Sequence, residues 1–266
     1  TLRRAVAVAF SVMIVSSCSE PREFVANAAL PAPPAAEAED WSGFGVLENV
    51  LNWTPEQQLR GYRNIDRIYP TRPVTASGRP YPLPSNWIEL TGLRYEVSGA
   101  TFDVDQFFKH NHLVGLLVIK RGKVVVERYA RGNTPETRWY SFSVAKSVVS
   151  MLIGAAVRDG YIQSLDATVT DYLPLLAGSA YGKVSIRDAI QMASGVAWIE
   201  DYTDPQSDIA STGGSALNRL RYLRKKPRVS PPGRVFNYNT AEANLLGAVL
   251  RAAIGNNLST YLEHKI

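Results

Sequence analysis

The sequence predicts an α+β fold, in which an antiparallel sheet is flanked by helices and interrupted by an all-helical region. The first observation is a hairpin pattern: residues 113–119 and 124–129 are apolar runs separated by a turn that contains Gly122. The second is the segment 148–157, which is apolar nearly all round and predicts a central, buried helix. The third is a series of helix start and stop signals across the middle third of the chain.

The first seventeen residues have the organisation of a secretion signal. Arg3 and Arg4 precede an apolar stretch, residues 5–15, that is too short to span a bilayer. The stretch ends at Val15-Ser16-Ser17-Cys18, which resembles the lipobox of bacterial lipoproteins and implies cleavage before Cys18 and lipidation of its thiol. Cys18 is the only cysteine, so no disulfide can form within the chain.

A simple secretion signal, or a signal that is retained as an anchor, is the alternative interpretation of residues 1–17. Under the lipoprotein interpretation the protein is attached to a membrane by its N-terminal lipid and faces the bacterial periplasm. Ser19, by the same resemblance, favours the outer over the inner membrane.

Two segments are expected before the main domain. Residues 18–40 are rich in Pro and Ala and predict a disordered tether. Residues 41–100 contain Trp41, Trp53 and Trp87 without clean periodicity, and predict an irregular wrap packed on the main domain at 101–266. Within the wrap, Thr54-Pro55-Glu56-Gln57 predicts a capped helix start with Pro in its first turn.

The remaining helices are predicted from the residues at their ends. Helices are expected at 102–109, after the capping box of Ser185 and Asp188, at 212–225, and at 241–254 before Gly255. The segment 198–208 between them is expected to be a polar, acidic loop. Thr260 and Glu263 predict one more helix start, and a chain that stops inside a new helix is expected to be incomplete.

The charge distribution argues against a nucleic-acid partner, and the placement of the histidines argues against a bound metal ion. The formal net charge is +5, but the basic residues are dispersed, and the densest run, residues 219–228, is expected to be a solvated helix face rather than a nucleic-acid site. His110 and His112 could be two metal ligands, but no third ligand cluster follows, so polar residues at a strand edge are the preferred interpretation. No metal and no cofactor are expected.

The strongest candidate for chemistry is the pair Ser143 and Lys146 at the start of the apolar segment. Residues three apart on a helix share one face, with Cβ atoms about 5–6 Å apart. A serine hydroxyl needs a base to become a nucleophile, and a neutral lysine in apolar surroundings can be that base. The alternative is a helix N-cap serine followed by an exposed lysine, since one S-x-x-K is expected about once by chance in such a chain.

Tyr238 is the second candidate, on a loop just before the helix at 241–254. A phenol near Lys146 can pass a proton to a leaving group. The alternative is a packed aromatic residue whose hydroxyl is satisfied by a neighbour.

Together these stretches resemble the superfamily of serine β-lactamases and penicillin-binding proteins, and within it the class C-related hydrolases of the 6-aminohexanoate-dimer hydrolase-like group. The matching stretches lie within residues 85–266 and are Gly115–Val118 with Tyr129, Trp139–Ser147, Asp159–Gly160 through Ser164–Asp166, Leu173–Pro174, Met192–Gly195, and Pro232–Gly233 through Phe236–Tyr238. The resemblance implies a β-lactamase/transpeptidase-like fold.

The resemblance also implies roles for single residues. Ser143 is the acylated nucleophile, and its backbone N–H forms half of the oxyanion hole. Lys146 is the base, and Tyr238 is the acid/base that serves the leaving group. Tyr202 corresponds to a family tyrosine that contacts the substrate amide. The implied activity is hydrolysis of an amide or ester of a small molecule through an acyl-serine.

The chain departs from the family pattern at three places. The usual Y-x-N is here Tyr238-Asn239-Thr240, which argues against a true β-lactamase, and no S-D-N triplet is present. The resemblance places the strand with K-T-G or H-x-G beyond residue 266, so the final strands of the sheet are expected to be missing. The 266-residue chain is therefore expected to have an open hairpin edge and to be inactive by itself.

Three functions remain open at this point. The first is an amide or ester hydrolase related to the 6-aminohexanoate-dimer hydrolases, and the second is a D-alanyl carboxypeptidase or esterase of the same fold. The third is a non-catalytic lipoprotein that uses the penicillin-binding fold to bind cell-wall peptides.

Overall fold

The structure is a computed structural model, and it describes residues 47–75, 80–212 and 215–266. The described residues belong to one compact unit. The expected signal peptide at 1–17, the lipidation site Cys18 and the tether at 18–40 lie outside the described residues. Among the residues that are described, no helix has both the length and the apolar character needed to cross a bilayer.

The N-terminal part begins with three short helices. They are the 3₁₀ helix η1 (Leu47–Asn52) and the α-helices α1 (Pro55–Arg63) and α2 (Ile65–Ile68). Thr54 caps α1 as its sequence predicts: its side chain accepts from the Gln57 N–H, and the Gln57 side chain accepts from the Thr54 N–H.

A second hairpin follows, in a region that was expected to be irregular. Strand β1 (Arg94–Val97) pairs antiparallel with β2 (Ala100–Asp103). Ser98 and Gly99 form the turn with φ of 52° and 81°, a conformation that suits glycine and that the sequence analysis did not anticipate at this place. The boundary expected at residue 100 therefore falls at the start of β2. Helix α3 (Val104–His110) follows directly, capped by Asp103.

The predicted hairpin at 113–129 is confirmed. Strand β3 (Gly115–Lys120) pairs antiparallel with β4 (Lys123–Tyr129), and both turn residues, Arg121 and Gly122, have positive φ. The outer edge of β4 is partly covered, because the Asn86 N–H donates to the Val124 carbonyl at 2.8 Å. Along β3, by contrast, Leu117 is 52% exposed.

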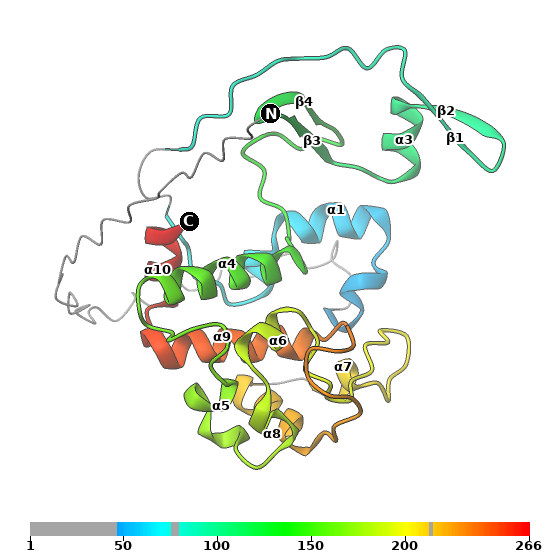
Figure 1. Cartoon of the computed structure of the whole chain (residues 1–266). Coiled ribbons are helices and arrows are strands. Elements are labelled where there is room, and N and C mark those ends of the chain that lie inside the picture. The colour runs from blue at the N-terminus through cyan, green and yellow to red at the C-terminus, as the bar shows by residue number, and fades with distance from the viewer. Residues whose placement is uncertain (1–46, 76–79, 213–214) are drawn as a thin grey trace, which may run out of the picture. The chain divides into compact units, whose positions relative to one another are not determined.

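The helical region makes up the rest of the described chain (Figure 1). Its α-helices are α4 (Val144–Arg158), α5 (Val169–Tyr172), α6 (Ile186–Ile190), α7 (Asp208–Ser211), α8 (Ala216–Lys225), α9 (Thr240–Ile254) and α10 (Leu258–Lys265), and two 3₁₀ helices, η2 (Pro174–Leu176) and η3 (Ala180–Lys183), lie between α5 and α6. The predicted ends of α9 are confirmed within one residue, and Gly255 follows it with φ of 79°.

Helices α4 and α9 pack against each other at the centre of the core (Figure 1). Leu152 and Ile153 of α4 are buried there with Leu245 of α9. The expected central helix is confirmed, but α4 is not buried all round, since Met151 is 56% exposed. The apolar sequence identified the helix, but it could not show that only one of its faces meets the core.

Three further expectations need correction. Helix α10 begins at Leu258 and not at Thr260, because Leu258 and Tyr261 both pack on the core and extend the helix toward the N-terminus. The helix expected at 212–225 starts later, since α8 begins at Ala216 after its N-cap Ser215, and a short helix that was not expected, α7, precedes it. The basic run at 219–228 is not wholly a solvated face, since the Lys226 ammonium is paired inside the protein with Asp208.

Candidate active site

The backbone presents Ser143 at the first turn of α4 in an unusual way. Phe142, directly before it, has a φ of 45°, a left-handed conformation that is rare for a bulky residue. Ser143 is the residue that precedes α4, but its side chain makes no capping hydrogen bond and its own backbone is already helical. The interpretation of Ser143 as an ordinary N-cap serine is therefore excluded, because its hydroxyl is directed elsewhere.

The hydroxyl of Ser143 is the meeting point of two other side chains. The Lys146 ammonium donates a hydrogen bond to Ser143 Oγ at 2.8 Å, and the Tyr238 phenol donates a second at 2.8 Å. Lys146 Nζ lies 5.1 Å from the centre of the Tyr238 ring. Ser143 is exposed and Lys146 is half-buried, so the serine hydroxyl is accessible while the lysine is partly shielded. The three residues that the sequence singled out are thus brought together across 95 positions of chain.

The surroundings of Tyr238 favour its ionised form. Burial acts to raise the pKa of the phenol, but the hydrogen bonds with Ser143 and Lys146 and the positive charge of Lys146 outweigh it. The pKa of Tyr238 is therefore held below its usual value of 10.0. A phenol that ionises more readily is better suited to exchanging a proton with a substrate.

Tyr238 is positioned by hydrogen bonds between two loops that are distant in sequence. The Asn237 N–H donates to the Met192 carbonyl at 2.8 Å, and the Gly233 N–H donates to the Ala193 carbonyl at 2.7 Å. Gly195 makes the close approach possible, because a Cβ at this position would lie 2.0 Å from the Ser230 carbonyl oxygen. The two stretches 192–195 and 232–238, which carried part of the resemblance, form one unit that presents the phenol.

The departure from Y-x-N has a clear structural outcome. Asn239 is buried, and its side-chain oxygen accepts from the Glu242 N–H at 3.1 Å, so it caps α9 instead of facing a substrate. Thr240, at the position of the family asparagine, donates its hydroxyl proton to Glu200. Neither residue presents a free side-chain amide beside Tyr238.

Glu200 links Tyr202 to the start of α9. Its carboxylate accepts from Tyr202 Oη at 2.6 Å, from Trp198 Nε1 at 2.6 Å and from the Thr240 N–H at 2.7 Å. Tyr202 is 51% exposed, and burial followed by the hydrogen bond to Glu200 raises its pKa to about 12. Tyr202 therefore remains a neutral phenol, held beside the loop that carries Tyr238.

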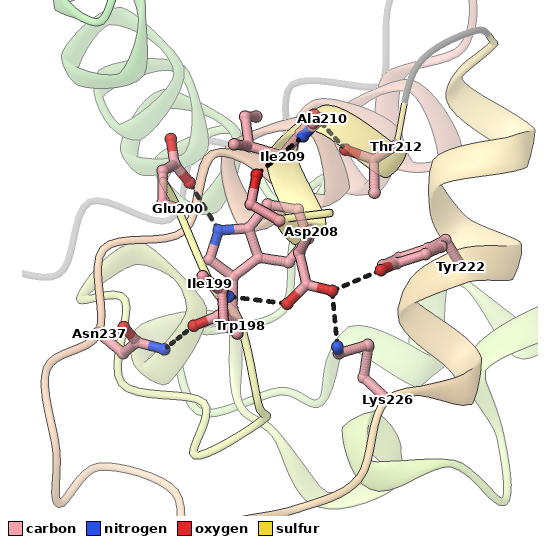
Figure 2. Close-up of polar contacts among 11 residues, drawn as sticks. Trp198, Ile199, Glu200, Asp208, Ile209, Ala210, Thr212, Tyr222, Lys226 and Asn237 are labelled. Carbon is pink, nitrogen blue, oxygen red and sulfur yellow. Dashed lines mark hydrogen bonds and ion pairs between the residues drawn. The ribbon is translucent and has the colours of Figure 1, made fainter. Parts of the chain in front are cut away.

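A buried carboxylate supports the same loop from the inside (Figure 2). Asp208 accepts from the Ile199 N–H at 2.7 Å and from Lys226 Nζ at 2.6 Å, and it also accepts from the Tyr222 hydroxyl. Burial opposes ionisation, but these donors hold the pKa of Asp208 below its usual value. The Trp198 carbonyl accepts from Asn237 Nδ2 at 3.1 Å, so the loop at 198–202 connects the Asp208 cluster with the residue before Tyr238.

Sequence reasoning missed Glu200 and Asp208 as parts of this site. It noted an acidic loop at 198–208, but it could not separate the carboxylates that turn inward from the exposed ones. The signal was present in Trp198, since a large aromatic residue within a polar loop indicates that part of the loop packs inward.

The candidate metal ligands have other partners. His110 packs edge-on against the Phe102 ring at 5.2 Å, and His112 Nδ1 lies 2.9 Å from an Arg131 nitrogen. Among the described residues, no group of three His, Cys, Asp or Glu side chains could hold a metal ion.

The helical core and the antiparallel hairpin have the fold of the β-lactamase-type serine hydrolases. The chain belongs to the beta-lactamase family, whose model matches residues 104–266. The match includes all four candidate residues, Ser143, Lys146, Tyr202 and Tyr238.

Two relatives refine this assignment. The 6-aminohexanoate-dimer hydrolase of Paenarthrobacter ureafaciens is 29% identical over 178 residues, which are 62% of this chain and 45% of that protein. A solved structure from Bacillus anthracis, provisionally named a 6-aminohexanoate-dimer hydrolase, superposes with a TM-score of 0.66 at 19% identity. The superposition covers 79% of this chain and 58% of that one, and it confirms the β-lactamase/transpeptidase-like fold. This chain thus spans about half the length of the relatives it matches.

Proposed function

We propose that this site hydrolyses an amide or ester bond through an acyl-serine intermediate. The observation that supports the proposal is the convergence of Lys146 Nζ and Tyr238 Oη on Ser143 Oγ, each at 2.8 Å. A serine hydroxyl becomes a nucleophile when a neighbouring side chain can take its proton. In this site no histidine is proposed for that task, and Lys146 and Tyr238 are the two side chains that can exchange protons with Ser143.

In the proposed mechanism Ser143 Oγ attacks the substrate carbonyl, and neutral Lys146 takes the hydroxyl proton. The negative charge that develops on the carbonyl oxygen lies near the start of α4, where the Ser143 N–H and the helix dipole favour it. Tyr238 passes a proton to the leaving amine or alcohol as the old bond breaks. Water then attacks the acyl-serine and gives a proton to the Tyr238 oxygen. The bond between Ser143 Oγ and the carbonyl carbon breaks, Lys146 returns the proton to Ser143, and the carboxylic acid leaves. The reaction needs no metal and no cofactor.

The preferred substrate class is a short linear amide. Two features support it: the related protein carries the name 6-aminohexanoate-dimer hydrolase, and neither Asn239 nor Thr240 offers a side-chain amide at the place where the family binds a β-lactam. A D-alanyl peptide, an ester, and a protein that only binds are the other outcomes that the test must separate.

The test uses the full-length protein, including the strands that the resemblance places beyond residue 266, and a fluorophosphonate, which forms a covalent bond with an activated serine. Wild-type protein should be labelled at Ser143, and Ser143→Ala should abolish labelling. Tyr238→Phe should slow turnover of an amide by about a hundredfold or more, because the leaving group loses its proton source. Full-length wild-type protein that stays unlabelled would contradict the hydrolase proposal and favour a binding protein. Its turnover of linear amides, D-alanyl peptides and esters ranks the substrates.

We also propose that the protein is tethered through a lipid on Cys18 to the periplasmic side of a bacterial membrane. Ser19 favours the outer membrane over the inner one. The proposal is supported by the sequence of residues 1–18 alone. Cells that express the chain should incorporate labelled fatty acid into it, and Cys18→Ser should prevent this. Incorporation that persists in the Cys18→Ser variant would rule out this anchor.

A further inference from the structure

We propose that helix α1, through Tyr62 and together with Trp53 just before the helix, is a positioning element for the nucleophile Ser143. This inference rests on the proposed function and extends it to a segment outside residues 104–266, the part of the chain that matches the family. It assigns a role to part of the region at 41–100 for which the sequence predicted only an irregular wrap.

The turn before Ser143 needs support. Phe142 has a φ of 45°, and a bulky side chain in the left-handed region persists only where its surroundings hold it there. The conformation of this residue sets the direction in which the chain enters α4. It therefore sets where Ser143 Oγ lies relative to Lys146 Nζ and Tyr238 Oη.

The rings that contact Phe142 come from the neighbouring Tyr140, at 4.1 Å, and from Tyr62 of α1. The Tyr62 ring is buried and meets the Phe142 ring edge-on at 4.9 Å, and it meets the Trp139 ring edge-on at 5.6 Å. On its other side Tyr62 stacks on Trp53 at 5.7 Å. Edge-to-face and stacked aromatic pairs at these distances are favourable, so Tyr62 holds the nucleophile turn against α1.

Backbone and charged contacts tie the same two segments together. The Tyr140 N–H donates to the Tyr62 carbonyl at 2.9 Å. Arg63 Nε donates to Asn133 Oδ1 at 2.6 Å, and Arg138 pairs with Asp66 at 2.6 Å. The segment at 130–142, which connects the β3–β4 hairpin to α4, is thus held at several points by residues 62–66.

The arrangement inside α1 is itself specific. A Cβ on Gly61 would lie 2.0 Å from Trp53 Cζ3, so glycine is needed for the indole to lie flat beneath Tyr62. The Tyr62 hydroxyl donates to the Val50 carbonyl at 2.8 Å, which fixes the ring from its far end. The ring is therefore anchored before it meets Phe142.

The test compares fluorophosphonate labelling of the full chain with that of three variants, each normalised to folded protein. Tyr62→Leu keeps apolar volume but removes the ring, and should slow labelling by about a hundredfold, the effect of displacing a reacting group by about 1 Å. Tyr62→Ala should slow it at least as much. Tyr62→Phe keeps the ring and should label at close to the wild-type rate.

The matched control is Tyr261→Ala. Tyr261 is as buried as Tyr62, but its hydroxyl binds Asp159 at the opposite end of α4. This variant should lose stability without slower labelling of the folded fraction. The proposal would be overturned if Tyr62→Leu were labelled at the wild-type rate, or if Tyr261→Ala slowed labelling as much as Tyr62→Leu. Either result would show that the Tyr62 ring does not determine the position of Ser143.

A second measurement does not depend on catalysis. Hydrogen exchange at the amides of residues 142–146 should become about tenfold faster or more in Tyr62→Leu and should stay unchanged in Tyr261→Ala. If the wild-type chain is not labelled at all, the proposed function fails, and the exchange data alone decide whether α1 positions this turn. Unchanged exchange in Tyr62→Leu would reject it.

Discussion

Glu200 shows how much one side chain near the nucleophile can organise. Its two oxygens accept from Trp198, from Tyr202, and from both the N–H and the hydroxyl of Thr240. A carboxylate can accept at about four positions, so this one is fully used. Because Thr240 is two residues beyond Tyr238, the contacts of Glu200 also restrict where the phenol can lie.

Replacing Glu200 by Gln should destabilise the protein by about 1–3 kcal/mol, since the amide nitrogen would face donors where an acceptor is needed. The free energy of unfolding in urea measures this change. The tyrosinate absorbance of Tyr202 should also appear at lower pH, because the pKa of Tyr202 loses the contribution of the Glu200 hydrogen bond.

The matched control is Glu127→Gln. Glu127 accepts from Tyr129 at 2.7 Å, with the same spacing of two residues, but the pair is exposed. Its loss should change the free energy of unfolding by less than about 1 kcal/mol. Equal effects at Glu200 and Glu127 would show that the contacts at Glu200 do not support the site.

At the scale of elements, Asp208 connects helix α8 to the loop at 198–202 (Figure 2). Lys226 and Tyr222 approach it from the α8 side, and the Ile199 N–H approaches it from the loop. The pKa of Asp208 lies below its unfolded value near 3.8, so the folded state favours the ionised form. Its contribution to stability is present above about pH 4 and is lost as the pH falls through the folded pKa.

Asp208→Asn should therefore lower the free energy of unfolding at pH 7 by about 2–3 kcal/mol, because hydrogen bonds to a charged group are lost. The difference between wild type and variant should shrink as the pH falls below about 4, which urea unfolding at several pH values would reveal. Asp166→Asn is the control, since its pair with Arg187 is exposed and should contribute little. A difference that stays constant down to acid pH would contradict this role of the Asp208 charge.

At the scale of the whole molecule, one buried carboxyl links core stability to pH. Glu242 of α9 is 1% exposed, and only its Oε1 has a hydrogen-bond partner within the described structure, the Tyr181 hydroxyl at 3.1 Å. Burial raises the pKa of Glu242 to about 7, although the neighbouring hydroxyls of Ser194 and Tyr181 act in the opposite direction. The folded state thus keeps a proton that the unfolded chain releases near pH 4.5.

Because the pKa of Glu242 is higher in the folded state, its contribution to the free energy of unfolding falls as the pH rises from 4.5 to 7. The decrease is on the order of 3 kcal/mol. Glu242→Gln cannot ionise, so the free energy of unfolding of this variant should lack that decline. Thermal or urea unfolding at several pH values between about 4.5 and 8 measures the slope. An equal slope in wild type and Glu242→Gln would show that another group is responsible.

Local patterns in the sequence were sufficient for the elements and for the candidate residues. The hairpin at 113–129, the capped start of α1, the glycine after α9 and the spacing of Ser143 and Lys146 all depend on neighbours a few positions apart, which the sequence displays directly. The turn at Ser98 and Gly99 was missed because a single Ser-Gly pair is equally typical of irregular chain.

Only the tertiary structure decided which of these features meet. Tyr238 lies 95 positions after Ser143 in the sequence and Tyr62 lies 81 positions before it, yet both contact the turn at Ser143. No local sequence pattern predicts either contact. The sequence also does not show which carboxylates of the loop at 198–208 turn inward, or which face of α4 packs against the core. The physical reason is that burial and hydrogen-bond partners are properties of packed neighbours, and packing brings together residues that the chain order keeps apart.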